Sequence, residues 1–228
     1  MIAENLRKIK ENIASAYRRS KRTTDEITLV AVTKIFPCET IEEAIRNGII
    51  DIGENFVQEL REKKERISDE YIRWHFIGHL QKNKVKYIAP WVYMVHSVDS
   101  LSLADELDKR AEQTKRTINF LLEIHTTNEP SKHGIVPEQT LKIAQQLQQF
   151  QNISLQGLMT IGPLSENPED ARPSFRLLRE LKDDLLCSGI NAPQLSMGMS
   201  GDYEIAIEEG ATIIRLGTAL FGKRIYTT

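Results

Sequence analysis

The chain has 228 residues, of which 27% are charged and 40% are apolar, and its formal net charge is −2. This composition is ordinary for a globular protein, and the length leaves little room beyond one large domain. The small net charge offers no field that would attract nucleic acid or an anionic membrane, and no apolar run approaches the ~20 residues needed to span a bilayer. We therefore expect one domain over residues 1–228, with neither nucleic acid nor a membrane as a partner.

The first predicted element is an amphipathic helix at the N-terminus. Its apolar residues recur at helical spacing, at Ile2, Leu6, Ile9 and Ile13. Because the segment has no continuous apolar stretch, it does not resemble a secretory signal.

The two cysteines, Cys38 and Cys187, form no CxxC pair and indicate free thiols in a reducing compartment. We therefore expect a cytoplasmic protein.

Eight short apolar or alternating segments come next, and each is followed by a polar segment with helical spacing. They cover residues 28–33, 51–55, 73–78, 94–99, 118–126, 155–161, 194–198 and 212–218. Strands that alternate with helices indicate a parallel sheet covered by helices. Eight such units in one α/β domain favour a closed (β/α)8 barrel of the TIM type, with the N-terminal helix as an extra element. A doubly wound open sheet is the alternative fold.

Local signals predict where several helices begin and end. Thr40 and Glu43 have the spacing of a capping box, and Gly48 follows as the stop. Pro137 and Pro168 lie where the first turn of two later helices should begin.

Lys34 is the first candidate for chemistry, because barrels carry their reactive groups at the C-terminal ends of the strands. It directly follows the first apolar strand and should point to the barrel mouth or interior. Burial at such a place lowers the pKa of a lysine and makes the neutral amine available for Schiff-base chemistry. The alternative is a lysine that snorkels or forms an ion pair at the strand end.

Two glycine-containing loops follow the last two strands. Residues 196–202 read SMGMSGD, include Ser200 and Gly201, and lead into a helix that begins near Asp202. Gly217 and Thr218 end the eighth strand. Loops at these two places are where barrels commonly bind phosphate, through backbone N–H groups and helix dipoles. The alternative is that the glycines serve only tight turns.

Two further polar residues lie where apolar ones are expected. Arg215 lies within the apolar segment TIIRLGT, and a buried charge needs a partner. That partner could be Glu54 or Glu123, near the ends of other strands, or a ligand in the barrel mouth. Asn55, at the end of the second strand, could cap the following helix together with Gln58, or could contact a ligand.

The five histidines do not indicate a metal site. His75 and His79 are four residues apart, but Gly78 separates a strand from a loop there, so the helical HxxxH geometry is absent. We expect His79 and His133 to line the mouth and the other histidines to be ordinary core or surface residues. The chain also has no nucleophile elbow, no Walker A loop and no opening GxGxxG.

Eight motifs between about residue 28 and residue 224 resemble the pyridoxal phosphate homeostasis protein family. They are LVAVTK, GENFVQE, WHFIGHLQKNK, VHSVDS, SKHG, LQGLMTI, LSMGMSGDYEIAIEEG and RLGTALFG. The resemblance implies a fold-type III barrel, similar to the N-terminal domain of bacterial alanine racemase. It also implies the cofactor pyridoxal 5′-phosphate (PLP), bound as a Schiff base on Lys34.

The resemblance implies roles for the other candidates as well. Arg215 would approach the pyridine nitrogen, Asn55 would lie near the ring, and the phosphate would be held by Ser200, Gly201, Gly217 and Thr218. Phe36 departs from the family pattern, because many members have a second lysine there. Lys132 in SKHG is then the next candidate for a transient contact with the cofactor.

The implied function is intracellular PLP homeostasis, in which the protein holds and supplies the cofactor and indirectly affects amino-acid and keto-acid pools. PLP-dependent apoenzymes are the expected acceptors. Racemisation needs a second acid or base on the opposite face of the substrate. In alanine racemase this group is a tyrosine, which a partner subunit with an extra β domain supplies. This chain ends ten residues after Thr218, and Tyr203 is expected to pack on its helix. We therefore assign no catalytic residue and expect a monomer without robust turnover.

Two enzymatic alternatives remain. One is a PLP-dependent, racemase-like enzyme acting on an amino acid. The other is a Schiff-base aldolase acting on a sugar phosphate, which would need the barrel, the lysine and the phosphate site but would give Arg215 no role.

Overall fold

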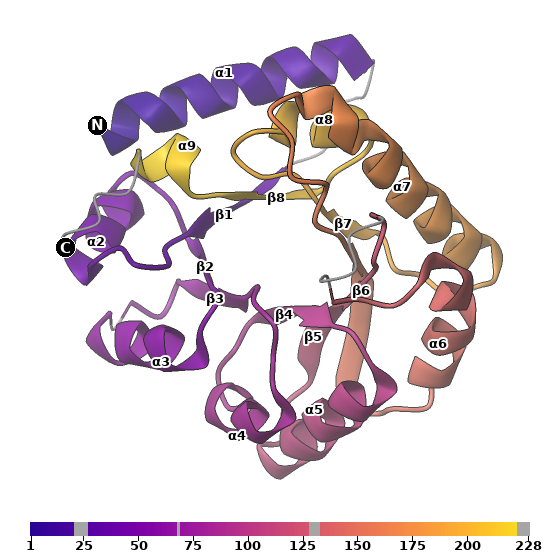
Figure 1. Ribbon diagram of the computed structural model, residues 1–228. Helices are drawn as coiled ribbons and strands as arrows, with labels where there is room; N and C mark the ends of the chain where they lie inside the picture. The colour runs from indigo at the N-terminus through magenta and orange to yellow at the C-terminus, as the bar shows by residue number, and fades with distance from the viewer. Residues whose placement is uncertain (21–26, 68, 128–132, 223–228) are drawn as a thin grey trace.

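The computed structural model describes residues 1–20, 27–67, 69–127 and 133–222. Eight parallel strands close into a barrel in chain order, and the helices surround it (Figure 1). The strands are Thr28–Val32 (β1), Asp51–Glu54 (β2), Arg73–Phe76 (β3), Met94–Val98 (β4), Ile118–Glu123 (β5), Ile153–Met159 (β6), Gln194–Ser196 (β7) and Ile213–Leu216 (β8). β8 pairs back with β1, with Val30 beside Arg215. The predicted closed barrel is confirmed, and the open sheet is excluded.

The helices follow the strands in alternation, after one extra helix at the N-terminus. They are Ile2–Ser20 (α1), Cys38–Arg46 (α2), Val57–Arg66 (α3), Val85–Ile88 (α4), Leu101–Gln113 (α5), Thr140–Leu147 (α6), Arg172–Cys187 (α7), Tyr203–Glu208 (α8) and Thr218–Phe221 (α9). Short 3₁₀ helices at Lys82–Lys84, Pro137–Gln139 and Pro168–Ala171 precede α4, α6 and α7. None of the helices in the described ranges is long and apolar enough to cross a bilayer.

The local helix signals give a mixed outcome. Pro137 and Pro168 each begin a 3₁₀ turn that continues into a helix, as predicted. Gly48 follows the end of α2 with φ of 89°, a conformation that favours glycine. The capping box at Thr40 and Glu43 is wrong, because α2 already begins at Cys38, so Thr40 lies inside the first turn.

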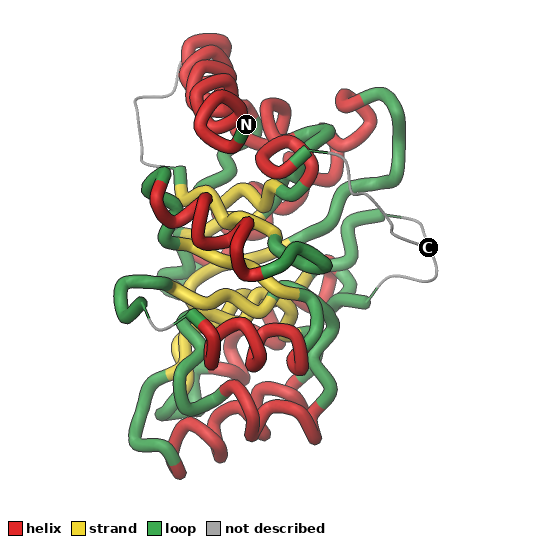
Figure 2. The backbone as a smooth tube through the Cα atoms, turned by 90° about the vertical axis from the view of Figure 1, so that its left-hand side faces the viewer, coloured by secondary structure: helices red, strands yellow, loops and turns green. Residues whose placement is uncertain are grey.

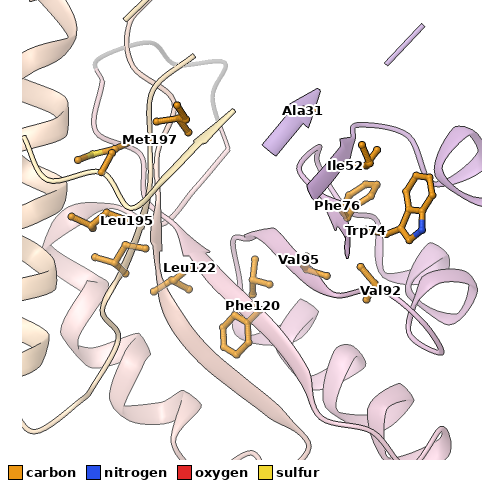
Figure 3. Packing of buried hydrophobic residues seen from close by; sticks show 14 of the residues in the cluster. Ala31, Ile52, Trp74, Phe76, Val92, Val95, Phe120, Leu122, Leu195 and Met197 are labelled. Atoms are coloured by element: carbon orange, nitrogen blue, oxygen red, sulfur yellow. The ribbon is translucent and has the colours of Figure 1, made fainter. Parts of the chain in front are cut away.

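The apolar core has two parts, one outside the strands and one inside the barrel. The larger part fills the space between strands and helices, and Figure 3 shows Trp74, Phe76 and Phe120 there. The smaller part lies on the inward faces of the strands and consists of Val30, Met94, Leu121, Met159 and Ile213, with Ile161 packed against it. Residues that alternate with the outer layer along a strand therefore point into the barrel.

The extra helix α1 lies outside the barrel strands (Figure 2) and packs against α8 and α9, which lie beside it in Figure 1. Ile2, Leu6 and Ile9 are buried by this contact. The Asn12 side-chain amide donates a hydrogen bond to the Tyr203 hydroxyl at 2.8 Å. Tyr203 is therefore a packing residue at this helix interface, as predicted.

Candidate functional site

Lys34 lies in a tight turn at the C-terminal end of β1. The Phe36 N–H donates to the Thr33 carbonyl at 2.9 Å and closes the turn. Ile35 has φ of 74°, a left-handed conformation that is strained for a β-branched residue. The Ile35 N–H donates to Glu59 Oε1 at 2.7 Å, which holds the turn in this shape. Lys34 is half-buried beside the barrel mouth.

A buried ion pair between Lys63 and Glu54 stabilises this turn. Lys63 Nζ, on α3, donates to Glu54 Oε1 at 2.5 Å and to the Thr33 carbonyl at 2.7 Å. Glu54 is fully buried, and this burial raises its pKa to about 7 although the Lys63 ammonium opposes the rise. The pair ties the end of β1 to β2 and α3. The pair could have been found from the sequence through Lys63, because this lysine lies three residues after Leu60 and so shares the buried face of α3.

Arg215 points into the barrel, because Ile214 and Leu216 on either side belong to the outer core. Its Nη1 donates to Ser196 Oγ at 2.6 Å, and its Nη2 donates to the Thr160 carbonyl at 2.9 Å. The residue is only 5% exposed, and burial lowers its pKa to about 10. Among the described residues these two neutral groups are its hydrogen-bond acceptors, and the charges of Asp202 and Glu123 act on it from farther away.

Neither glutamate considered as a partner forms an ion pair with Arg215 among the described residues. Glu54 faces α3 and pairs with Lys63 instead. Glu123 lies at the mouth and is 7% exposed, and burial together with the Asp99 charge raises its pKa to about 7, against the effect of Arg215. Glu123 and Asp202 are nevertheless close enough for their charges to oppose the fall in the pKa of Arg215. The role of Arg215 toward a ligand stays a prediction.

The loops after β7 and β8 meet beside the same strand ends. Ser200 Oγ accepts a hydrogen bond from the Ala219 N–H at 3.1 Å, which joins the two loops. Gly201 follows Ser200 directly, and Gly217 and Thr218 precede Ala219, so the structure brings all four predicted phosphate residues together. Ser200, Gly201 and Ala219 also line a cavity of about 610 Å³, whose other walls come mostly from α1 and α8.

Asn55 lines a second cavity, of about 200 Å³, in the barrel mouth. Its Oδ1 atom is buried and has no hydrogen-bond partner among the residues that the structure describes. The N-cap of α3 is Phe56, and no side chain caps this helix, so the capping role proposed for Asn55 and Gln58 is wrong. A Cβ atom at Gly78 would lie 2.2 Å from the Asn55 carbonyl oxygen, so only glycine permits this close approach.

His79 and His133 line the same mouth cavity, as predicted. Their rings stack with centroids 3.8 Å apart, and His79 Nδ1 lies 3.3 Å from Asp99 Oδ2. One ligand atom from each of these three residues lies within 4.8 Å of the others, a donor set that zinc accepts. Spacing along the chain suggests only the pair of His75 and His79 and misses this grouping. The absence of a resident metal stays a prediction.

Lys132, the next candidate for a contact with the cofactor, lies outside the described residues.

Comparisons with known proteins agree with this geometry. The family model of the alanine racemase N-terminal domain matches residues 5–225. A pyridoxal phosphate homeostasis protein from Aquifex aeolicus is 45% identical, over 98% of this chain and 98% of its own length. Among solved structures, a protein described as unknown from Bifidobacterium adolescentis is 37% identical, with a TM-score of 0.89 over 96% of this chain and 94% of its own. PipY of Synechococcus elongatus, solved with PLP bound, is 33% identical, with a TM-score of 0.85 over 97% of this chain and 100% of its own.

Proposed function

The chain belongs to the family of pyridoxal phosphate homeostasis proteins, whose barrel is that of the alanine racemase N-terminal domain, and we propose that it binds PLP on Lys34, holds it and supplies it to other proteins. One observation carries this proposal. β1, which Lys34 follows, lies between β2, which leads to Asn55, and β8, which carries the buried Arg215 and leads to the loop joined to Ser200.

The residues at this place fit the chemistry of PLP. The joined loops offer a hydroxyl and backbone N–H groups to a phosphate. Asn55 Oδ1 is a buried acceptor to which no described residue donates a hydrogen bond. Arg215 is a hydrogen-bond donor inside the barrel, and its bonds to Ser196 and Thr160 hold two of its nitrogens in place. A ligand with a phosphate at one end and a polar aromatic ring at the other satisfies these groups together.

Lys34 attaches the cofactor covalently in this proposal. Its ε-amine would hold the cofactor covalently through the aldehyde group. When bound, PLP supplies a ring that can withdraw electrons from a carbon next to the attached amine. Arg215 would limit this withdrawal of electrons, because a cation near the ring nitrogen disfavours the protonation of that nitrogen.

We further propose that this site does not turn over amino acids robustly. Turnover by racemisation needs an acid or base on the face of the substrate opposite Lys34. Tyr203 is engaged with Asn12 at the α1–α8 interface and is 6% exposed, so it does not take that role. In the same proposal the whole chain, residues 1–228, is one PLP-binding domain that works as a cytoplasmic monomer without a resident metal and passes PLP to apoenzymes.

The decisive experiment compares the purified wild type with Lys34→Ala and Lys34→Arg, with Lys82→Ala as a control at an exposed lysine. Each protein is incubated with PLP, its absorbance spectrum is recorded, and it is then reduced with borohydride and mapped by peptide mass spectrometry. We expect a yellow wild type and control, two colourless Lys34 variants, and a pyridoxyl group on Lys34. A wild type that stays colourless with added PLP contradicts the proposal and favours the sugar-phosphate aldolase.

A second experiment addresses turnover. The PLP-loaded protein is incubated with amino acids in deuterium oxide, and deuterium at the α-carbon is followed by NMR. We expect no exchange beyond that caused by free PLP. Faster exchange that disappears in Lys34→Ala would show the racemase-like alternative to be correct.

A further inference from the structure

A continuous line of hydrogen bonds crosses the barrel interior from the N-terminal end of β2 and β3 to Arg215. Asp51 Oδ1 lies 2.8 Å from His75 Nε2, and His75 Nδ1 lies 2.9 Å from His96 Nε2. His96 Nδ1 lies 3.0 Å from Ser196 Oγ, which accepts from Arg215 Nη1 at 2.6 Å. At the far end, Asp51 also accepts a hydrogen bond from the half-exposed Arg73 at 2.5 Å.

The chemistry of the two ends fixes the direction of every bond in this line. An ionised carboxylate only accepts, so His75 Nε2 carries a proton and donates to Asp51. Burial lowers the pKa of both His75 and His96, which keeps both rings neutral. His75 Nδ1 is then an acceptor, and His96 Nε2–H donates to it.

The bonds between His96 and Arg215 have fixed directions as well. His96 Nδ1 is left without a proton, so it accepts from the Ser196 hydroxyl. The Ser196 oxygen then has its lone pairs for the Arg215 guanidinium, which can only donate. The directions worked out from Asp51 and from Arg215 agree at Ser196, and every proton in the line has an acceptor.

Such a line is unusual inside a barrel, where branched apolar side chains usually fill the interior. Buried polar groups are costly unless all of them are hydrogen-bonded, and this line satisfies that condition. Both imidazoles are almost completely inaccessible, with His75 1% exposed and His96 0% exposed. Neither can contact a ligand in the mouth directly, so an effect of these histidines on a ligand must pass through Ser196 and Arg215.

We propose that His75 and His96 are positioning residues for the cofactor ring, because they hold the Ser196 hydroxyl as an acceptor for Arg215 and so aim its guanidinium at the pyridine nitrogen. The inference rests on the proposed function, since it takes PLP as the ligand that Arg215 faces. Through the same hydrogen bonds, the Arg73–Asp51 pair at the opposite end of the barrel is connected to Arg215.

The first test uses the protein without PLP and is independent of the proposed function. Two-dimensional ¹H–¹⁵N NMR of the histidine rings reports which nitrogen carries the proton. We expect both His75 and His96 as neutral rings protonated at Nε2. In Ser196→Ala, the His96 Nδ1 resonance should move toward the position of an imidazole nitrogen without a hydrogen bond. Rings protonated at Nδ1, or an unchanged His96 resonance in Ser196→Ala, would overturn the inference.

The second test measures the bound chromophore in Ser196→Ala and His96→Leu. Ser174→Ala is the matched control, because its hydroxyl is also buried and hydrogen-bonded, to the Thr126 carbonyl, but lies outside the line. We expect both line variants to shift the absorbance maximum of bound PLP and to weaken its binding roughly tenfold, the order for one lost hydrogen bond to a charged group. The control should change neither.

The outcomes separate the two proposals. If only Ser196→Ala changes the spectrum, the histidines do not act through Ser196 and the inference is wrong. If wild type binds no PLP while the NMR experiment finds both Nε2 tautomers, the proposed function fails but the hydrogen-bonded line stands. Circular dichroism of each variant confirms that it is folded before its spectrum is compared.

Discussion

Replacing Glu123 by glutamine should remove a pH-dependent loss of stability. In the folded protein, burial raises the pKa of Glu123 from 4.5 to about 7, whereas the unfolded chain ionises at the ordinary value. Between these two values the folded state binds more protons than the unfolded state, so the free energy of unfolding falls as pH rises. The contribution is complete below pH 4.5 and is lost above pH 7.

The magnitude follows from the width of this interval. Each pKa unit corresponds to about 1.4 kcal/mol, so the rise from 4.5 to about 7 is worth about 3 kcal/mol. Glutamine resembles the protonated carboxyl group in shape and carries no charge. Glu123→Gln should therefore match the wild type at pH 4.5 and exceed its unfolding free energy by about 3 kcal/mol at pH 8. The decline that Glu54 causes has the same sign and stays in both proteins.

Urea unfolding of the PLP-free proteins, followed by circular dichroism between pH 4.5 and pH 8, measures this difference. Glu42→Gln is the control, because that side chain is exposed and should leave the difference at zero throughout. A difference for Glu123→Gln that is constant with pH, or that shrinks as pH rises, would refute the reasoning.

Three further substitutions test the support of the site. Lys63→Met leaves the buried Glu54 without its counter-ion and should lower the unfolding free energy by about 3–5 kcal/mol, while the double variant with Glu54→Leu should recover much of it in urea titrations. Ile35→Asn should raise the unfolding free energy by about 1 kcal/mol, measured the same way, because asparagine tolerates the left-handed backbone better than isoleucine. Gly78→Ala should cost about 1–3 kcal/mol in thermal unfolding and weaken PLP binding, because its Cβ would push against the Asn55 backbone. An unchanged stability in any of the three would contradict the corresponding contact.

Much of the fold could be predicted because it depends on periodic patterns. The apolar segments alternate with helical ones eight times, and a parallel arrangement buries both faces of such strands. Local boundaries are harder to predict, because competing signals lie close together. Thr40 and Glu43 have the spacing of a capping box, yet α2 starts two residues earlier, after Pro37.

The candidate site shows the same division. Lys34, Ser200, Gly201, Gly217 and Thr218 could be found from the sequence, because each follows a strand and such ends meet at one side of a barrel. The hydrogen-bond partners of Arg215 could not, because the sequence suggests Glu54 and Glu123 near strand ends, whereas the structure supplies Ser196 Oγ and the Thr160 carbonyl. Glu54 points outward to Lys63 on α3, and only the tertiary structure shows this direction.

The sequence by itself determined the element order, the closed barrel, the lysine at the end of β1 and the family. The tertiary structure alone decided which polar side chains share the interior. His75, His96 and Ser196 come from three different strands, and Ser196 lies 100 residues after His96 in the chain. Spacing along the chain carries no information about such contacts, since they depend on strand register and on the closure of the sheet.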